Sequence, residues 1–166
     1  MDTPMFADLG LPDVLLSAVL DMGFESPSPI QAKTIPLALE GKDLIGLSQT
    51  GSGKTAAFAL PTLAAIDAHL AEPQALIVCP TRELAVQVCE EVFRLGCKIK
   101  GLRALPVYGG APIDRQLKGL RKGAHIVVGT ARSDLVFHLQ LLRKTACYRN
   151  CVVPQPDEPA KIAGPQ

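Results

Sequence analysis

The octapeptide Ser48-Gln49-Thr50-Gly51-Ser52-Gly53-Lys54-Thr55 constrains the fold of this chain more than any other feature. It follows an apolar run at 43–47 and opens a helical pattern at 54–70. This context and the order G-x-G-K-[ST] are typical of a loop that binds phosphate. Glycines let backbone N–H groups converge on phosphate oxygens, the helix N-terminus adds about half a positive charge, and Lys54 adds a full one. We therefore predict a nucleotide site here, with Thr55 as a magnesium ligand.

A dinucleotide-binding loop is the competing interpretation, because Gly51 to Ala56 also fits G-x-G-x-x-A. Such a site needs an acid at the end of the next strand to hold a ribose hydroxyl, whereas the next strand here ends at Cys79-Pro80. It would also leave Lys54 and Thr55 unexplained. The strict phosphate-loop pattern has Gly where this chain has Ser48, a small departure, so ATP or GTP is the favoured ligand.

Apolar runs alternate with helical patterns along the chain. The predicted strands are 43–47, 75–79, 102–107 and 125–129, and the predicted helices are 11–22, 29–41, 54–70, 82–95 and 112–121. Strands that alternate with helices indicate right-handed βαβ units. The predicted fold class is therefore α/β, with a parallel sheet and helices on both faces.

The charge of the chain is balanced in sum but not in distribution. Among 166 residues there are 17 Lys and Arg against 16 Asp and Glu. Eight cations between residues 94 and 122 are opposed only by Asp114: Arg94, Lys98, Lys100, Arg103, Arg115, Lys118, Arg121 and Lys122. This stretch is either a solvated surface or a stripe that faces phosphates, and Tyr108 is the one aromatic residue near its middle that a base could stack on.

Composition narrows the class of protein further. A hydrophobic share of 48% excludes disorder throughout, and no apolar run reaches the 18 or more residues of a membrane span. The five cysteines show no C-x-x-C pair and no histidine at zinc-ligand spacing, so we expect no structural metal. An odd cysteine count and no charged-then-apolar leader predict a reduced, cytoplasmic protein with no membrane partner.

Further motifs stand on either side of the phosphate loop in a fixed order. They are Phe6, Gly23-Phe24-Glu25-Ser26-Pro27-Ser28-Pro29-Ile30-Gln31, Ser48 to Thr55, Pro80-Thr81-Arg82-Glu83-Leu84-Ala85, Gly109-Gly110 and Val127-Val128-Gly129-Thr130. Over about residues 6–130 the chain resembles the N-terminal RecA-like domain of DEAD-box ATP-dependent RNA helicases. The resemblance implies a RecA-like fold that is incomplete on its C-terminal side. It also implies ATP and Mg²⁺ as cofactors and RNA as the partner, bound by its backbone with little sequence preference.

The resemblance also assigns the nucleotide site. Phe6 is expected to stack on adenine, and Gln31 to bind the adenine edge, which an amide side chain can do with two hydrogen bonds. Gln31 has a structural alternative, because Ser28-Pro29-Ile30-Gln31 is also a capping box for the helix that follows. The expected catalytic residues are Lys54 and Thr55, and the other expected ATP contacts are Ser26, Ser48, Gln49, Thr50, Gly51, Ser52 and Gly53.

For RNA, the resemblance implies contacts from two motifs and from the end of a third. The expected residues are Pro80, Thr81, Arg82, Gly109, Gly110 and Thr130. The first two motifs have a structural alternative: Thr81 is a good helix cap, and Gly109-Gly110 suits a simple turn.

The resemblance breaks after Thr130. Family members continue with Pro-Gly-Arg and later show a strand ending in Asp-Glu-Ala-Asp, but this chain reads Ala131-Arg132-Ser133-Asp134. Asp157-Glu158 lies between prolines, so no central strand can place these two carboxylates at the nucleotide. We expect a truncation or frame change here, with a helicase domain at 1–130 and a divergent, partly disordered tail at 131–166.

The predicted function follows from this break. The chain is expected to bind ATP weakly and not to hydrolyse it, because phosphoryl transfer needs an acid that orients magnesium and a group that positions water. The alternatives are a non-catalytic helicase remnant that binds RNA or a protein partner, a product that does not fold, and another enzyme with a phosphate-binding loop. The last would explain neither Phe6 with Gln31 nor the segment 80–85.

Overall fold

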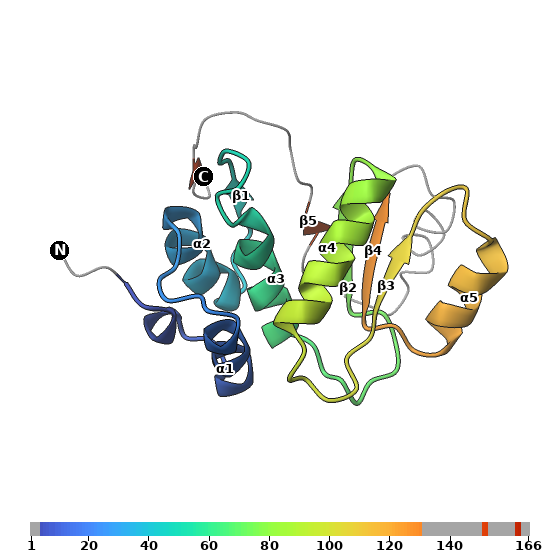
Figure 1. Ribbon diagram of the computed structural model, residues 1–166, viewed down its shortest axis with the longest axis horizontal. Coiled ribbons are helices and arrows are strands. Elements are labelled where there is room, and N and C mark those ends of the chain that lie inside the picture. The colour runs from blue at the N-terminus through green and yellow to red at the C-terminus, as the bar shows by residue number, and fades with distance from the viewer. Residues whose placement is uncertain (1–3, 131–150, 153–161, 164–166) are drawn as a thin grey trace. The chain divides into compact units, whose positions relative to one another are not determined.

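The computed structural model describes residues 4–130, 151–152 and 162–163 (Figure 1). These residues form two compact units. The first contains residues 4–65, 94–99 and 162–163, and the second contains residues 66–93, 100–130 and 151–152. The predicted tail at 131–166 lies almost wholly outside the described residues, as do Asp157 and Glu158.

The first unit is helical. Its elements are η1 (Phe6–Leu9), α1 (Asp13–Asp21), α2 (Pro29–Leu39), α3 (Lys54–Ala64), β1 (Ile45–Gly46) and β6 (Ile162–Ala163). Helix α3 packs against α2 and α1 (Figure 1), around a core that includes Leu15, Ile35, Leu60 and Leu63. The three helices are where the sequence predicts them, except that α3 ends before residue 70.

The early end of α3 has a local cause. The Gln74 side chain binds the backbone of the segment that follows: its Oε1 accepts from Asp67 N at 2.8 Å, and its Nε2 donates to Asp67 O at 2.7 Å and Leu70 O at 3.2 Å. These bonds hold residues 67–70 in turns, so the backbone groups of that segment do not continue the helix.

The strand predicted at 43–47 differs in the structure. Only Ile45–Gly46 is a strand, and it pairs antiparallel with β6, Ile45 opposite Ala163. A strand of a parallel sheet needs apolar cover on both faces, but Ile45 is 65% exposed and Gly46 has no side chain to pack. Among the described residues, β1 therefore belongs to a two-stranded sheet separate from the parallel one.

The second unit holds the parallel sheet. Its elements are β2 (Ala75–Cys79), α4 (Arg82–Leu95, which continues into the first unit), β3 (Ala104–Val107), α5 (Ile113–Arg121), β4 (Ile126–Thr130) and β5 (Cys151–Val152). The strand order is β3-β4-β2-β5, and every pair is parallel. The register sets Cys79 beside Thr130 and Val107 beside Gly129, so β2, β3 and β4 end at one carboxyl edge. This confirms the predicted α/β class.

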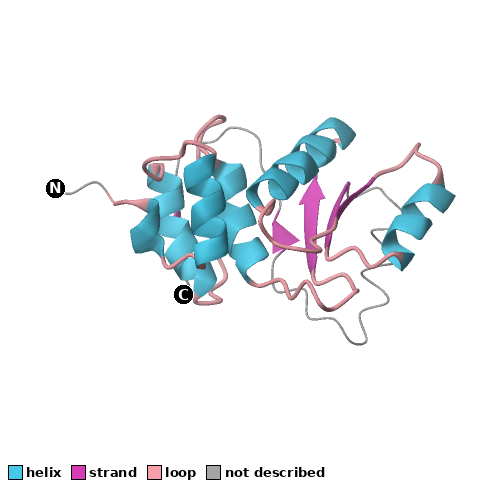
Figure 2. Ribbon diagram, turned by 60° about the horizontal axis from the view of Figure 1, so that its bottom comes forward, coloured by secondary structure: helices cyan, strands magenta, loops and turns pink. Residues whose placement is uncertain are grey.

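Helices cover both faces of this sheet (Figure 2). On one face Leu76, Val107 and Val127 form a buried cluster, against which Leu120 of α5 packs. Cys79 points to the opposite face, where its thiol is close enough to Cys89 of α4 to contribute to the raised pKa of the Cys89 thiol. Burial raises the pKa of both thiols to about 11, so both stay protonated and unreactive at neutral pH.

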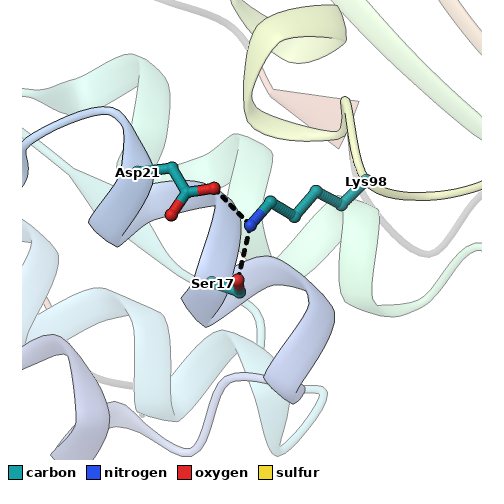
Figure 3. A network of polar contacts seen from close by, with 3 residues as sticks. All are labelled: Ser17, Asp21 and Lys98. Atoms are coloured by element: carbon teal, nitrogen blue, oxygen red, sulfur yellow. Dashed lines mark hydrogen bonds and ion pairs between the residues drawn. The ribbon is translucent and has the colours of Figure 1, made fainter.

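A polar network fastens the segment after α4 to α1 within the first unit (Figure 3). The Lys98 ammonium donates to Ser17 Oγ at 2.5 Å and forms an ion pair with Asp21. Because Asp21 is two-thirds exposed, this pair contributes little to the free energy of unfolding. Across the described ranges, no helix is long and apolar enough to cross a bilayer.

His125 ties together the amino ends of three strands. It is 2% exposed, its Nδ1 accepts from Arg103 N at 3.0 Å before β3, and its carbonyl accepts from Gln74 N and Ala75 N at the start of β2. Burial first, and then the nearby Arg103 guanidinium, lower the pKa of His125 below its ordinary 6.5. The acceptor role at Nδ1 likewise requires the neutral ring.

We expect the chain to lose stability as the pH falls from about 7.5 to 5.5. The pKa of His125 is lower in the folded chain than in the unfolded chain. As the pH falls, the unfolded chain therefore takes up the proton first, and the free energy of unfolding decreases below about pH 6.5. The midpoint temperature of thermal unfolding should fall by a few degrees over this pH range. His125→Asn, whose amide oxygen can replace Nδ1 as an acceptor, should make the midpoint nearly independent of pH. His69→Asn, at an exposed histidine, is the control. An equal fall in His125→Asn would contradict the prediction.

Candidate functional site

The phosphate loop is tightly turned and partly closed on itself. Gly51 and Gly53 have φ of 75° and 82°, the left-handed region that only glycine adopts freely. Ser48 and Ser52 share a hydrogen bond of 2.6 Å between their hydroxyls, and the Lys54 ammonium donates to the carbonyl of Ser48. The loop therefore holds its own cation against its first residue.

Two side chains from the start of α2 hold this loop from outside. Gln31 Nε2 donates to Gly53 O at 3.1 Å, and Ser28 Oγ donates to Ser52 O at 2.7 Å. Gln31 Oε1 also accepts from Ser28 N at 2.8 Å, so the predicted reach of Gln31 back to the helix start is confirmed. The segment 28–31 and the loop, which are over 20 residues apart in sequence, thus form one polar cluster.

Gln31 keeps hydrogen-bonding capacity for a ligand. A glutamine amide carries two donor hydrogens and two acceptor lone pairs on its oxygen. One donor goes to Gly53 and one lone pair to Ser28, which leaves one of each. The capping role and the predicted adenine role are therefore compatible in geometry, although the side chain is only 3% exposed.

The other predicted adenine contacts are placed differently. Phe6 is 1% exposed and packs edge-to-face on Phe24, with ring centroids 6.0 Å apart. Its ring is part of the core of the first unit, so stacking on a base requires it to turn outward. Ser26 is exposed in the segment before α2, as are Gln49 and Thr50 in the loop.

The residues present fit a nucleotide phosphate chain with a magnesium ion. Bonding within α3 starts with Ala57 N to Gly53 O at 3.1 Å, so the N–H groups of the preceding positions form the free end of the helix dipole. A Cβ at Gly51 would meet nothing within 4 Å, so the backbone is open there. Lys54 and Thr55 stand in the first turn of α3, half-buried, beside this opening.

The predicted RNA contacts gather at the carboxyl edge of the parallel sheet in the second unit. Pro80, Thr81 and Arg82 follow β2 and are exposed, and Gly109-Gly110 follows β3. Thr130 ends β4 and is 8% exposed. Thr81 Oγ1 accepts from Leu84 N at 3.2 Å, so the predicted capping role of Thr81 is confirmed.

The structure brings Arg82 and Gly110 together. A Cβ placed on Gly110 would lie 2.7 Å from an Arg82 guanidinium nitrogen, and Gly110 has φ of 87°. The guanidinium therefore lies against the backbone of Gly110, in the space that the Cβ of any other residue would occupy. The predicted motifs at 80–85 and 109–110 form one surface.

A buried glutamine holds this glycine turn. Gln116 of α5 is 8% exposed, its Oε1 accepts from Tyr108 N at 3.1 Å, and its Nε2 donates to Tyr108 O at 3.2 Å and Ala111 O at 3.3 Å. These bonds flank Gly109-Gly110 on both sides. The turn is thus fixed to α5.

Sequence reasoning missed Ser28 and Gln116 as site residues. Ser28 was expected only as a helix cap, but its hydroxyl also reaches the phosphate loop. Gln116 is a polar residue on the apolar side of a helix pattern, three residues from Ile113 and four from Leu120. A buried polar group at such a position needs partners, which is the signal that could have found it.

A RecA-like α/β domain with a phosphate-binding loop is the class that this fold and loop define. A profile of the DEAD/DEAH box helicase family matches residues 28–153. The chain is 56% identical over 125 residues to the DEAD-box ATP-dependent RNA helicase CshA of Bacillus cereus, which covers 75% of this chain and 24% of the relative. It is 54% identical over 135 residues to the ATP-dependent RNA helicase DeaD of Klebsiella pneumoniae, covering 81% and 21%.

Solved structures agree with the sequence relatives. A DEAD box protein from Methanococcus jannaschii superposes with a TM-score of 0.75 and 41% identity, covering 82% of this chain and 37% of that one. Saccharomyces cerevisiae Dbp5 bound to RNA and ADP BeF3 gives 0.72 and 33%, covering 83% and 34%. The chain therefore belongs to the DEAD/DEAH box helicase family. It spans about a quarter of the length of the curated relatives it matches.

We expect Gly53→Ala to destabilise the first unit more than Gly51→Ala does. Both glycines have positive φ, so each substitution costs about 1 kcal/mol in backbone strain. At Gly53 the new methyl would also collide with the Gln31 amide nitrogen and lie 3.3 Å from Ser28 Oγ, whereas at Gly51 it meets nothing. Unfolding by urea measures both costs.

A second pair of variants isolates the collision. In a Gln31→Ala background the collision with the amide is removed and only the 3.3 Å contact with Ser28 Oγ remains, so most of the extra cost of Gly53→Ala over Gly51→Ala should disappear. Equal costs for the two glycine variants in the wild-type background would show that the Gln31 contact carries no energy.

Proposed function

We propose that this chain is the ATP-binding part of an ATP-dependent RNA helicase, the activity named for its curated relatives. The observation that carries the proposal is the hydrogen bond from Gln31 to Gly53 O. It joins the side chain suited to reading a base to the loop suited to holding phosphates. One bound nucleotide then engages both, and specificity for the base is coupled to the geometry of the loop.

In this proposal the chain's own residues position the nucleotide. Gln31 presents its remaining donor and acceptor to the adenine edge, and Phe6 turns outward to stack on the ring. Lys54 exchanges the Ser48 carbonyl for a phosphate oxygen, and Thr55 binds Mg²⁺, which would neutralise phosphate charge. Ser26, Ser48, Gln49, Thr50, Gly51 and Ser52 complete the site.

The carboxyl edge of the parallel sheet is the proposed site for RNA. Arg82 donates to a phosphate, and Gly109, where a Cβ would meet nothing within 4 Å, lets the RNA backbone approach closely beside the guanidinium that lies against Gly110. Pro80, Thr81 and Thr130 border the same edge. Contacts of this kind carry little base specificity. The Dbp5 structure with bound RNA supports an RNA partner for this fold.

Hydrolysis is not part of the proposal for this chain alone. Within the described ranges, no strand ends in an acidic pair, and no three His, Cys, Asp or Glu residues gather where they could hold a metal ion. We place the helicase domain at 1–130 and propose a cytoplasmic location, as for a protein that works on RNA with reduced cysteines.

We expect calorimetric titration with Mg²⁺ to detect weak binding of ATP and ADP and no binding of GTP. Lys54→Ala removes the cation that faces phosphate and should abolish binding of both nucleotides. Gln31→Ala should lower ATP affinity about tenfold or more, because the base and the loop both lose a contact. Lys33→Ala, an exposed lysine on the same helix as Gln31, is the matched control. Equal affinity for GTP and ATP would refute adenine recognition.

We also expect no RNA-stimulated ATP turnover above background. The described residues offer a cation and a hydroxyl at the loop but no strand-borne acid to orient magnesium or water. A coupled phosphate-release assay with and without single-stranded RNA measures this. Turnover that disappears in Lys54→Ala would overturn the expectation and place a complete catalytic set within these 166 residues.

A further inference from the structure

Helix α5 carries a basic face that none of the contacts above uses. Its inward side is Gln116 with the half-buried Leu117, Gly119 and Leu120, which pack towards the sheet. Its exposed residues are Ile113 at its start, one acid and four cations: Asp114, Arg115, Lys118, Arg121 and Lys122. Arg103 adds a fifth cation, because its guanidinium donates to the carbonyl of Lys122 at the end of the helix. We call these five cations the α5 basic face.

Not every cation of the basic stretch in the sequence belongs to this face. Lys98 belongs to the first unit and pairs with Asp21. By contrast, no member of the α5 basic face forms an ion pair with any other described residue. Five exposed cations without an acidic partner among the described residues leave a local excess of positive charge there, which attracts a polyanion.

Helix stability does not explain all of these charges. Cations in the last turn of a helix interact favourably with its dipole, which accounts for Lys118 and Arg121. Arg115 stands in the first turn, where the dipole disfavours a cation. Lys118 follows Arg115 by three residues, and Lys122 follows Lys118 by four. The three residues therefore lie in one line along the helix.

The line begins at the proposed RNA edge. Helix α5 starts three residues after Gly110, and Gln116 fixes the glycine turn to the helix through Tyr108 and Ala111. Since β3 and β4 are parallel, α5 runs back from the carboxyl edge, with Arg115 nearest that edge and Lys122 farthest from it. Nine residues of helix cover about 13 Å, enough for more than one phosphate of an RNA strand.

From this geometry we propose that the α5 basic face binds the phosphates of RNA that continues past Gly109-Gly110, extending the RNA footprint of the domain along α5. The proposal rests on the proposed RNA edge. A lipid surface fits less well, because a membrane-bound helix needs a free apolar side, and the apolar side of α5 packs on the sheet. The face also adjoins the glycine turn proposed to contact RNA, which favours RNA over an acidic protein.

The test is RNA binding by the full chain, measured by fluorescence anisotropy with oligouridylates of about 6 and about 14 nucleotides. Lys118→Gln with Lys122→Gln should weaken binding of the longer RNA about tenfold and lower its salt slope by about 1.4, the value for two phosphate contacts on a single strand. The shorter RNA should bind as it does to the wild type. Lys33→Gln with Lys42→Gln removes the same charge from the first unit and should change neither.

Further measurements separate this inference from the proposed function. Arg82→Ala should weaken both RNAs, and the α5 double variant should keep wild-type ATP binding. If Arg82→Ala acts and the α5 variant does not, the RNA edge stands and the extension along α5 is wrong. Equal losses in the α5 and control variants, no RNA binding by the wild type, or displacement of RNA by polyglutamate of equal charge would each overturn it.

Discussion

The contact between the Gln31 amide and the carbonyl of Gly53 is the constraint on which the first unit depends. It fixes where the start of α2 meets the phosphate loop, and it works because Gly53 has a left-handed backbone and no side chain. Ser28 adds a second bond to the same loop from the same turn. Each buried polar atom of the two side chains thereby has at least one partner, so the cluster can be largely buried.

Much of this fold could be predicted because its signals are local. Ser28 and Gln31 mark the start of a helix by chemistry between neighbours, and the apolar runs at 75–79 and 125–129 are long enough to be buried strands. The strand before the phosphate loop could not be predicted in the same way. Its partner, β6, lies over 110 residues away, and pairing depends on which distant segment is available rather than on Ile45 itself.

The residues of the candidate site also divide into those with a local sequence signal and those that depend on long-range contacts. Lys54, Thr55 and Arg82 could be identified from motifs, because each has its spacing written in neighbouring residues. Three other features are tertiary contacts: Phe6 is buried against Phe24, Gln116 binds the backbone around the glycine turn, and the Arg82 guanidinium lies against Gly110. Sequence pattern assigns such residues a type of chemistry, and only the packed structure assigns them a partner.

The bond between the Lys54 ammonium and the Ser48 carbonyl has a consequence for how tightly any anion is held. Because the cation already has an internal acceptor, an arriving phosphate substitutes for an existing ligand instead of filling an empty coordination position. Such an exchange yields the difference between a bond to a charged phosphate and the existing bond to a neutral carbonyl. The loop is thereby spared an unpaired charge when it is vacant, and its affinity is set by competition, so a weak ligand with one phosphate gains less than one that engages the whole loop.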